Sequence, residues 1–421
     1  MTLNVGVANG VITPQHPIAL AGFANRQGTS LGTADDLMVG ALVLDASGVG
    51  ADPIVIVTLD LLGLYGEALT SEIKHSITEH TGVTDDRTFL CCSHTHSAPV
   101  LDSAVHMTGS ETAAAQEYRS QLPKTIATVV ASALSSRRSA VASLGIGRER
   151  IGHNRHTNAD EPIDDELLVL RLDEVDGQPL AALVSYACHP VANGDSFHRY
   201  SADYVAALRD AVSSHTGAPT LFLQGACGDI DPLTRSADGS AARELGERLA
   251  RAAVEAWNAA EQIEPNPLTL TRADIALPGR IPDDMARARG IVSGSEPAAL
   301  DFASRFNRFW MRAAVEADDR GQQPSVSAAV GVLRLGTFAV AFHQAELYCE
   351  LGMQIKAVSP FVATAIAGYT DGMIWYVPSK AAFESPHAYG VTVSLVASGA
   401  GELLRDQIVG LLDEAAEEGE A

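Results

Sequence analysis

The sequence predicts an α/β fold in the mixed α+β sense, with a layered sheet core flanked by helices. Short, nearly continuous apolar runs are typical of strands that are covered on both faces. Amphipathic helical patterns lie between these runs, which favours one layered core over separate all-α and all-β halves. The chain has 421 residues, of which 46% are hydrophobic and 19% charged, so it can bury a sizeable core.

The elements follow from the order of these patterns along the chain. The apolar runs predict strands at residues 53–59, 88–92, 166–172, 180–187 and 220–224. The helical patterns between them predict helices at 67–80, 112–136, 203–215 and 241–261. The last third of the chain predicts a charged helix at 297–320, strands at 325–335, 337–342 and 361–367, and an acidic helix at 403–418.

The charge balance excludes whole classes of partner. The chain carries 29 Lys and Arg against 52 Asp and Glu, which gives a net charge of −23. Nucleic acids and anionic membrane surfaces both attract basic proteins, so neither is an expected partner. No apolar run reaches the ~18 residues of a membrane helix. The first residues lack the pattern of a secretory signal, and the five cysteines are dispersed, so we expect a reduced, cytoplasmic protein.

A histidine pair follows one of the predicted strands. His94 and His96 come directly after the run 88–92, within Ser-His-Thr-His-Ser-Ala-Pro. Residues i and i+2 of an extended segment share a face, so both imidazoles can point at one site. Such a pair can hold Zn²⁺ together, or one ring can bind the metal while the other acts as an acid or hydrogen-bond donor. The alternative is a pair of surface histidines on a loop.

Two more predicted strands end in residues that could carry chemistry. His189 follows the run 180–187, and Asp229 and Asp231 follow the run 220–224 after a glycine. In α/β folds, sites gather at strand ends, and carboxylates there can act as bases. Taken singly, the histidine could be a core residue and the Gly-Asp-Ile-Asp-Pro segment an ordinary turn.

Three further positions complete the candidates. Arg155 offers a forked cation that could clamp a substrate carbonyl or carboxylate. Glu346 lies at an expected strand-to-helix junction, where a carboxylate can bind a metal or merely cap the helix. An aromatic cluster follows at Tyr369, Trp375 and Tyr376.

Taken in order, these residues resemble the neutral/alkaline (non-lysosomal) ceramidases, specifically their N-terminal catalytic domain. The resemblance covers nearly the whole chain. It rests on the opening at 6–14, Ala-Gly-Phe-Ala at 21–24, the histidine motif at 93–99, Asn-Arg at 154–155, the strand that follows at 164–172, the loop at 224–232 and Tyr-Val-Pro-Ser at 376–379.

The resemblance implies a ligand set and a set of substrate contacts. In that family one catalytic zinc is held by two histidines, a glutamate and a tyrosine; the matching residues here are His94, His189, Glu346 and Tyr376. His96 and Arg155 would face the substrate carbonyl. Gly22, Arg155 and Tyr369 are the expected substrate contacts, and Tyr369 competes with Tyr376 for the tyrosine position.

The chain also departs from the family. Asp231 stands where the family has a catalytic serine, and the family's C-terminal immunoglobulin-like domain has no counterpart. We therefore expect residues 1–421 to form a single ceramidase-like domain, with an insertion or subdomain at 264–324, and a substrate other than ceramide. Asp231 could act as a general base, orient a ligand or pair with a basic substrate group, and Asp229 is an alternative base.

The sequence thus predicts a zinc-dependent hydrolase that cleaves an amide, ester or lactone acyl bond of a small molecule with metal-activated water. The main alternative is an acyltransferase or cyclase that uses an amine acceptor on the same zinc site. A metal-dependent amidohydrolase barrel is less favoured, because its His-x-His motif opens the first strand. A non-catalytic binding protein is disfavoured by the intact His94, His189 and Glu346. No stable membrane association is expected. The sequence is compatible with a homo-oligomer and does not decide the oligomeric state.

Overall fold

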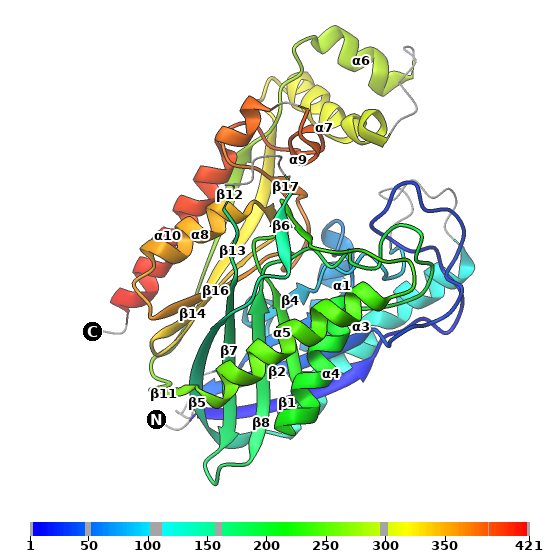
Figure 1. Cartoon of the computed structure of the whole chain (residues 1–421). Coiled ribbons are helices and arrows are strands. Elements are labelled where there is room, and N and C mark those ends of the chain that lie inside the picture. Colours follow the sequence, from blue (N-terminus) through cyan, green and yellow to red (C-terminus); the bar gives the residue numbers. More distant parts are fainter. Residues whose placement is uncertain are drawn as a thin grey trace.

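Two stacked β-sheets form the centre of the molecule, and helices cover the outer face of each. The computed structural model describes residues 3–46, 52–101, 112–155, 162–294, 302–385 and 387–418. Figure 1 shows α8 and α10 on one side of the stack and α1, α3, α4 and α5 on the other. The predicted mixed α+β layered class is confirmed.

The larger sheet has nine strands in the described residues. Its pairing order is β4 (Thr88–Cys92), β3 (Ile54–Leu59), β2 (Met38–Ala46), β1 (Leu3–Val11), β5 (Arg138–Arg148), β7 (Glu166–Glu174), β8 (Pro179–Tyr186) and β9 (Thr220–Gln224), with β11 (Glu261–Ile263) paired to β5. The outer helices on this sheet are α1 (Glu67–Thr81), α3 (Ala113–Ser135), α4 (Tyr204–Thr216) and α5 (Ser240–Asn258).

The second sheet comes from the last third of the chain. It contains β12 (Leu268–Pro278), β13 (Ser325–Leu335), β14 (Phe338–His343) and β16 (Ala363–Ala367), covered by α8 (Cys349–Val358) and α10 (Ala400–Glu417). Two short ladders complete the fold: β6 (Gly152–Asn154) with β10 (Ile230–Pro232), and β15 (Glu346–Leu347) with β17 (Tyr376–Val377). The remaining turns of helix are Asp85–Arg87, Ala381–Glu384 and α9 (Tyr389–Thr392).

Alternation along the strands explains why the sheets stack. On β2, Val39, Ala41 and Val43 pack in the core beneath the first helix layer, whereas Leu42 and Leu44 pack between the two sheets. Each strand is therefore apolar on both faces, as its sequence indicates.

An aromatic contact joins the two sheets near their edge. The ring of Phe89 on β4 stacks on that of Phe342 on β14, with a centroid distance of 3.8 Å and an interplanar angle of 14°. Both rings are buried, so the contact fixes β4 against the second sheet just before the histidine pair.

Residues 264–324, expected as an insertion, divide into two parts. β12 pairs with β13 along its whole length, so it belongs to the second sheet. Helices α6 (Met285–Ser293) and α7 (Phe302–Asp319) project beyond the sheets (Figure 1). Residues 295–301, which include the start of the expected helix at 297–320, lie outside the described residues.

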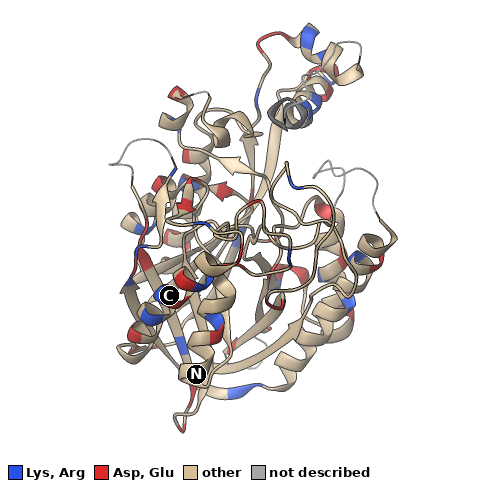
Figure 2. Cartoon of the chain, turned by 45° about the vertical axis from the view of Figure 1, so that its right-hand side comes forward, with Lys and Arg blue, Asp and Glu red and all other residues tan. Residues whose placement is uncertain are grey.

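Charged residues of both signs are spread along the described chain. Figure 2 shows Lys and Arg scattered among Asp and Glu over several elements. Among the described helices, none has the length and apolarity needed to cross a membrane.

Candidate metal centre and active site

The two histidine-bearing strand ends lie side by side because a buried glutamine joins them. His94 follows β4 and His189 follows β8, as predicted. Gln224, the last residue of β9, donates through its side-chain nitrogen to the carbonyl of Ser93 at 3.0 Å and to that of Cys188 at 2.9 Å. The side chain thus bridges the residues that directly precede the two histidines, although β4 and β9 stand at opposite ends of the pairing order.

The second sheet supplies a carboxylate and a phenol at the same place. Glu346 and Tyr376 are register partners in the parallel β15–β17 ladder. The Glu346 backbone N–H also donates to the Trp375 carbonyl at 2.9 Å. The sequence places these two residues on the metal only through resemblance, and the ladder explains how residues 30 positions apart come together.

Donor atoms converge at this point. Glu346 Oε2 lies 3.4 Å from His94 Nε2 and 3.3 Å from His189 Nε2. His96 Nε2 lies 3.3 Å from His94 Nε2. Ligand atoms about 2.0–2.1 Å from a tetrahedral zinc are separated by about 3.3–3.4 Å, so these spacings fit the edges of such a site.

Two of these donor atoms have no hydrogen-bond partner, which also fits a metal site. His189 Nε2 and Glu346 Oε2 are buried and have no hydrogen-bond partner. Buried polar atoms without partners cost free energy, and a metal ion would satisfy both. The three imidazoles alone form a group whose donor atoms lie within 4.8 Å of one another.

Backbone carbonyls set the tautomers of two histidines. His94 Nδ1 lies 2.7 Å from the Leu62 carbonyl, and His189 Nδ1 lies 2.6 Å from the Cys227 carbonyl. Each Nδ1 therefore carries the proton, and each Nε2 offers a lone pair to the centre, which is the usual arrangement of metal-binding histidines.

The surroundings favour a neutral His189 ring and an ionised Glu346 carboxylate. Burial lowers the pKa of His189, so its ring is neutral at physiological pH. Burial alone would raise the pKa of Glu346, but charge and hydrogen-bond interactions with His94 and His189 in their protonated forms lower it to about 2; a bound cation would keep the carboxylate ionised when the rings are neutral. Neutral histidine and ionised glutamate are the forms that bind zinc.

His96 differs from the other two histidines because no carbonyl holds its Nδ1. That atom is buried and has no hydrogen-bond partner. Burial, together with His94 and His189, lowers the pKa of His96 well below its ordinary value. Packing contacts position the ring instead. It makes a T-shaped contact with the Phe23 ring, and a Cβ on Gly22 would lie 2.4 Å from it.

The Arg26 side chain connects the chain segments around His96 through hydrogen bonds. Its guanidinium is buried and donates to the carbonyls of Ala21, His96, Gly194 and Asp195. Three chain segments thus meet on one side chain, which fixes the backbone on both sides of the His96 ring.

Arg155, predicted as a substrate clamp, lies beside Tyr376. Its guanidinium carbon is 5.2 Å from the Tyr376 ring centre and 5.8 Å from that of Tyr389. It donates to the Gly228 carbonyl in a short hydrogen bond, and its Nη1 lies 3.7 Å from Asp231 Oδ1. The β6–β10 ladder positions it, since Arg155 follows β6.

The two aspartates have different surroundings. Asp231 Oδ2 accepts from Arg235 at 2.7 Å, while its other oxygen faces Arg155. Asp229 is buried, and its two oxygens accept from Asn154 Nδ2 at 2.7 Å and from the Cys349 backbone at 2.8 Å. Both carboxylates thus have cationic or N–H partners, an arrangement typical of residues that orient others.

Tyr369 lies behind the centre, in contact with His94. Its ring stacks on the His94 ring at 4.0 Å, and its hydroxyl lies 3.2 Å from Cys227 Sγ. Tyr376 instead lines the cavity at the centre, with its ring parallel to that of His189 at 6.4 Å. The geometry thus gives Tyr369 a supporting place behind a histidine.

Strained backbone is concentrated here. His94, Tyr369 and Trp375 have positive φ angles of 66°, 55° and 64°. Non-glycine residues rarely adopt this conformation, and when they do, it is often at functional sites.

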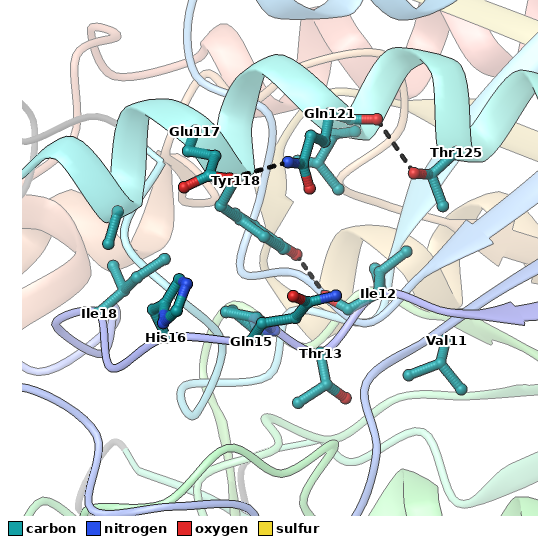
Figure 3. Close-up of a pocket in the computed structure, with 13 residues that line it drawn as sticks. Val11, Ile12, Thr13, Gln15, His16, Ile18, Glu117, Tyr118, Gln121 and Thr125 are labelled. Atoms are coloured by element: carbon teal, nitrogen blue, oxygen red, sulfur yellow. Dashed lines mark hydrogen bonds between the residues drawn. The ribbon is translucent and has the colours of Figure 1, made fainter.

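Two cavities adjoin the centre. One of about 40 Å³ is lined by His94, His96, Glu346 and Tyr376 together with apolar side chains. Another of about 550 Å³ begins at Arg155, and Tyr389 lines both. A third cavity, of about 150 Å³, lies between the segment 11–18 and α3 (Figure 3) and shares no lining residue with these two.

Sequence reasoning did not find the residues that hold this arrangement together. Gln224 has a visible signal, since a glutamine ends an otherwise apolar strand, and such a residue needs buried partners. Arg26 and the carbonyls of Leu62 and Cys227 have no signal, because their roles depend on contacts between distant segments.

Comparison with known proteins identifies the fold. Neither a family model nor a curated protein sequence matches the chain. Among solved structures, neutral ceramidase from Pseudomonas aeruginosa matches with a TM-score of 0.78 at 16% identity, covering 99% of this chain and 75% of that chain. A ceramidase complexed with C2 matches with a TM-score of 0.78 at 15% identity, covering 99% and 76%.

This chain has the neutral ceramidase fold. The resemblance seen in the sequence is therefore confirmed for the fold, at an identity too low to establish a shared substrate. Within the neutral ceramidase fold, this chain keeps three histidines and a glutamate in contact around one point.

Proposed function

We propose that this chain is a zinc-dependent hydrolase that cleaves an amide bond, or a related ester or lactone bond, in a small acylated molecule. The observation that carries the proposal is the convergence of His189 Nε2 and Glu346 Oε2 at 3.3 Å with no hydrogen-bond partner for either atom. His94, His189, Glu346 and Tyr376 are the proposed ligands. Zinc in such a site polarises a carbonyl and lowers the pKa of water to about 7.

The chain's own residues would prepare the substrate for attack. His96, with its Nε2 3.3 Å from that of His94, borders the place where a substrate carbonyl would lie. Arg155 would donate to the developing oxyanion from the Tyr376 side. Phe23, Trp375 and Tyr65 would exclude water from the acyl side of the bond.

Asp231 and Asp229 take orienting roles in this proposal. Asp231 faces Arg155 and Arg235, so it would hold the Arg155 guanidinium in place. Asp229 holds Asn154 and the start of α8. His96 is neutral and its Nε2 faces the unprotonated Nε2 of His94, so it would donate a hydrogen bond to the substrate carbonyl and to the developing oxyanion.

A reducing, cytoplasmic location belongs to the same proposal. All five cysteines are buried and none forms a disulfide. Burial raises the pKa of the Cys188, Cys227 and Cys349 thiols well above the ordinary value of cysteine. These thiols therefore stay protonated and unreactive.

The first test is metal content after His94→Ala. The purified wild type should hold one zinc per chain, and the variant should lose it together with turnover on N-acyl amides. A lost metal site removes several kcal/mol of transition-state stabilisation, so turnover should fall at least about a thousand-fold. His75→Ala is the matched control, because His75 is exposed on α1. Full zinc content in the His94→Ala protein would contradict the ligand assignment.

Solvent labelled with ¹⁸O separates hydrolysis from acyl transfer. A hydrolase must place one solvent oxygen in the acid product. Unlabelled acyl product that appears only when an amine acceptor is added would favour the acyltransferase or cyclase alternative.

A further inference from the structure

The two cavities at the centre differ in how polar their walls are. The small one, of about 40 Å³, is lined by the proposed metal ligands and by apolar side chains that include Leu20, Leu62 and Met373, all nearly buried. The large one, of about 550 Å³, has a mixed wall with more polar groups, which include Arg155, Glu350 and Ser379. Tyr389 belongs to both walls, so the cavities lie on either side of it.

We propose that the substrate is an amide of a short, apolar acyl group, of about two to four carbons, with a larger polar amine that carries hydrogen-bond donors. The acyl group occupies the small cavity, the carbonyl lies at the histidine cluster, and the amine part extends past Arg155 into the large cavity. This inference rests on the proposed function, which it makes specific.

The volume of the small cavity limits the length of the acyl group. A water-sized group needs about 10–15 Å³ of such a cavity, so the small cavity accepts about three of them. A longer chain would displace side chains that are already packed: Leu20 is 4% exposed, Leu62 5% and Met373 9%. Overfilling a packed site is unfavourable because the neighbours are forced out of their preferred rotamers.

Polarity assigns the other part of the substrate. The wall of the large cavity carries the carboxylates of Glu350 and Glu384 and the hydroxyls of Ser379 and Ser385. An alkyl chain placed there would strip water from these groups without replacing its hydrogen bonds. Hydroxyl or amino groups on the amine part would replace them.

Departure of the product supports this orientation. Hydrolysis frees the amine, which must leave before the next turnover. The large cavity reaches exposed residues such as Ala381 and Glu384, so the amine has a direct way out. The small cavity is lined by the proposed metal ligands and suits the part of the substrate that stays near them.

The first experiment measures binding and does not depend on turnover. Sodium acetate, butanoate and octanoate, which mimic the acid product, are titrated into the metal-loaded and metal-free protein by calorimetry. We expect butanoate to bind the loaded protein at least ten-fold more tightly than octanoate. Tighter binding of octanoate, or no binding of any of the three, would overturn the inference.

A cavity-enlarging variant makes the size argument sharper. Met373→Ala removes a wall of the small cavity and should shift the preference toward octanoate by at least ten-fold. Met353→Ala is the matched control, because Met353 is a partly buried methionine that lines neither cavity. An equal shift in both variants would show that the selectivity does not arise at the small cavity.

Turnover then tests the two parts of the substrate together. We expect N-butanoyl glucosamine to be cleaved with a kcat/KM at least a hundred-fold above those of N-octanoyl glucosamine and N-butanoyl octylamine. Ala388→Leu narrows the large cavity and should lower kcat/KM for N-butanoyl glucosamine at least ten-fold more than it lowers kcat/KM for N-butanoyl methylamine.

The outcomes separate the inference from the function on which it rests. Cleavage of long-chain amides with the highest kcat/KM would refute the inference and keep the hydrolase. Short-acid selectivity without cleavage of any amide, ester or lactone would refute the hydrolase and keep the assignment of the small cavity.

Discussion

At Gly22 the absence of a side chain decides where the His96 ring can lie. The residue has a φ of 94°, and a Cβ there would meet the His96 ring at 2.4 Å. Since His96 Nδ1 has no hydrogen-bond partner, contact with neighbours is what orients this ring. Gly22 is therefore a positioning residue for the one histidine that no carbonyl fixes.

Gly22→Ala should lower turnover and keep the metal. The new methyl group displaces the His96 ring, and a misplacement of about 1 Å can cost about a hundred-fold in rate. Zinc content should stay near that of the wild type, because His94, His189 and Glu346 do not touch Gly22. The measurement is kcat on an N-acyl amide together with bound zinc.

Gly28→Ala is the matched control for this prediction. Gly28 has a similar φ of 85°, but no atom lies within 4 Å of the position of its Cβ. Both variants carry the same backbone strain, and only Gly22→Ala carries the clash. Equal losses of turnover would mean that strain in the loop, and not the His96 ring, is responsible.

At the scale of elements, the centre is made by strand ends that a single glutamine holds together. Gln224 joins the end of β4 to the end of β8 and is fully buried. It also accepts from the Cys188 backbone N–H at 3.3 Å. The spacing between His94 and His189 therefore depends on this side chain.

Gln224→Leu should weaken both the fold and the metal site. The buried Ser93 carbonyl loses its donor and the Cys188 N–H loses its acceptor, at about 1–3 kcal/mol each, so the free energy of unfolding should fall by about 2–6 kcal/mol. Zinc affinity should fall about 10–100-fold, as expected when a supporting partner of a metal ligand is lost. Urea unfolding and a competitive zinc titration measure the two effects, with the exposed Gln262→Leu as the control. An unchanged zinc affinity in a folded Gln224→Leu protein would contradict this role.

The same elements show what the sequence could predict. Strands β4 and β9 have the bounds that their apolar runs predict, because such runs are buried on both faces. His94 and His96 also meet, although the strand ends at Cys92 and His94 has a positive φ, so the extended i, i+2 geometry is not what brings them together. The approach of Glu346 to His189 could not be derived from periodicity, because it depends on how the second sheet packs on the first.

At the scale of the whole molecule, a buried polar network makes stability depend on pH. Asp203 is 2% exposed and begins α4. Burial raises its pKa to about 6, although backbone N–H groups of Asn193, Tyr204 and Ala192 oppose the shift. Burial also raises the pKa of Asp35 to about 6. Ser201 bonds to Asp35 and to the Asp203 backbone, so the two carboxyls share one network.

The contribution of Asp203 to stability should therefore fall as the pH rises from about 4 to above 6. The unfolded-state pKa of an aspartate is about 3.9, so the folded protein binds the Asp203 proton more tightly than the unfolded chain does. This contribution is fully present below about pH 4 and is lost as the pH rises through 6; it amounts to at most about 3 kcal/mol. Urea unfolding between pH 4 and pH 7 should show a shallower decline for Asp203→Asn than for the wild type. Parallel curves would contradict the assigned shift.

The order of the proposed ligands along the chain has a consequence for biosynthesis. His94 and His189 lie in the part of the chain that forms the first sheet, whereas Glu346 and Tyr376 come with the second sheet, which a ribosome makes last. A nascent chain that has folded its first sheet holds three imidazoles and no carboxylate at the centre. Completion of the proposed ligand set then becomes the closing event of synthesis, and a chain that stops before β17 never acquires it.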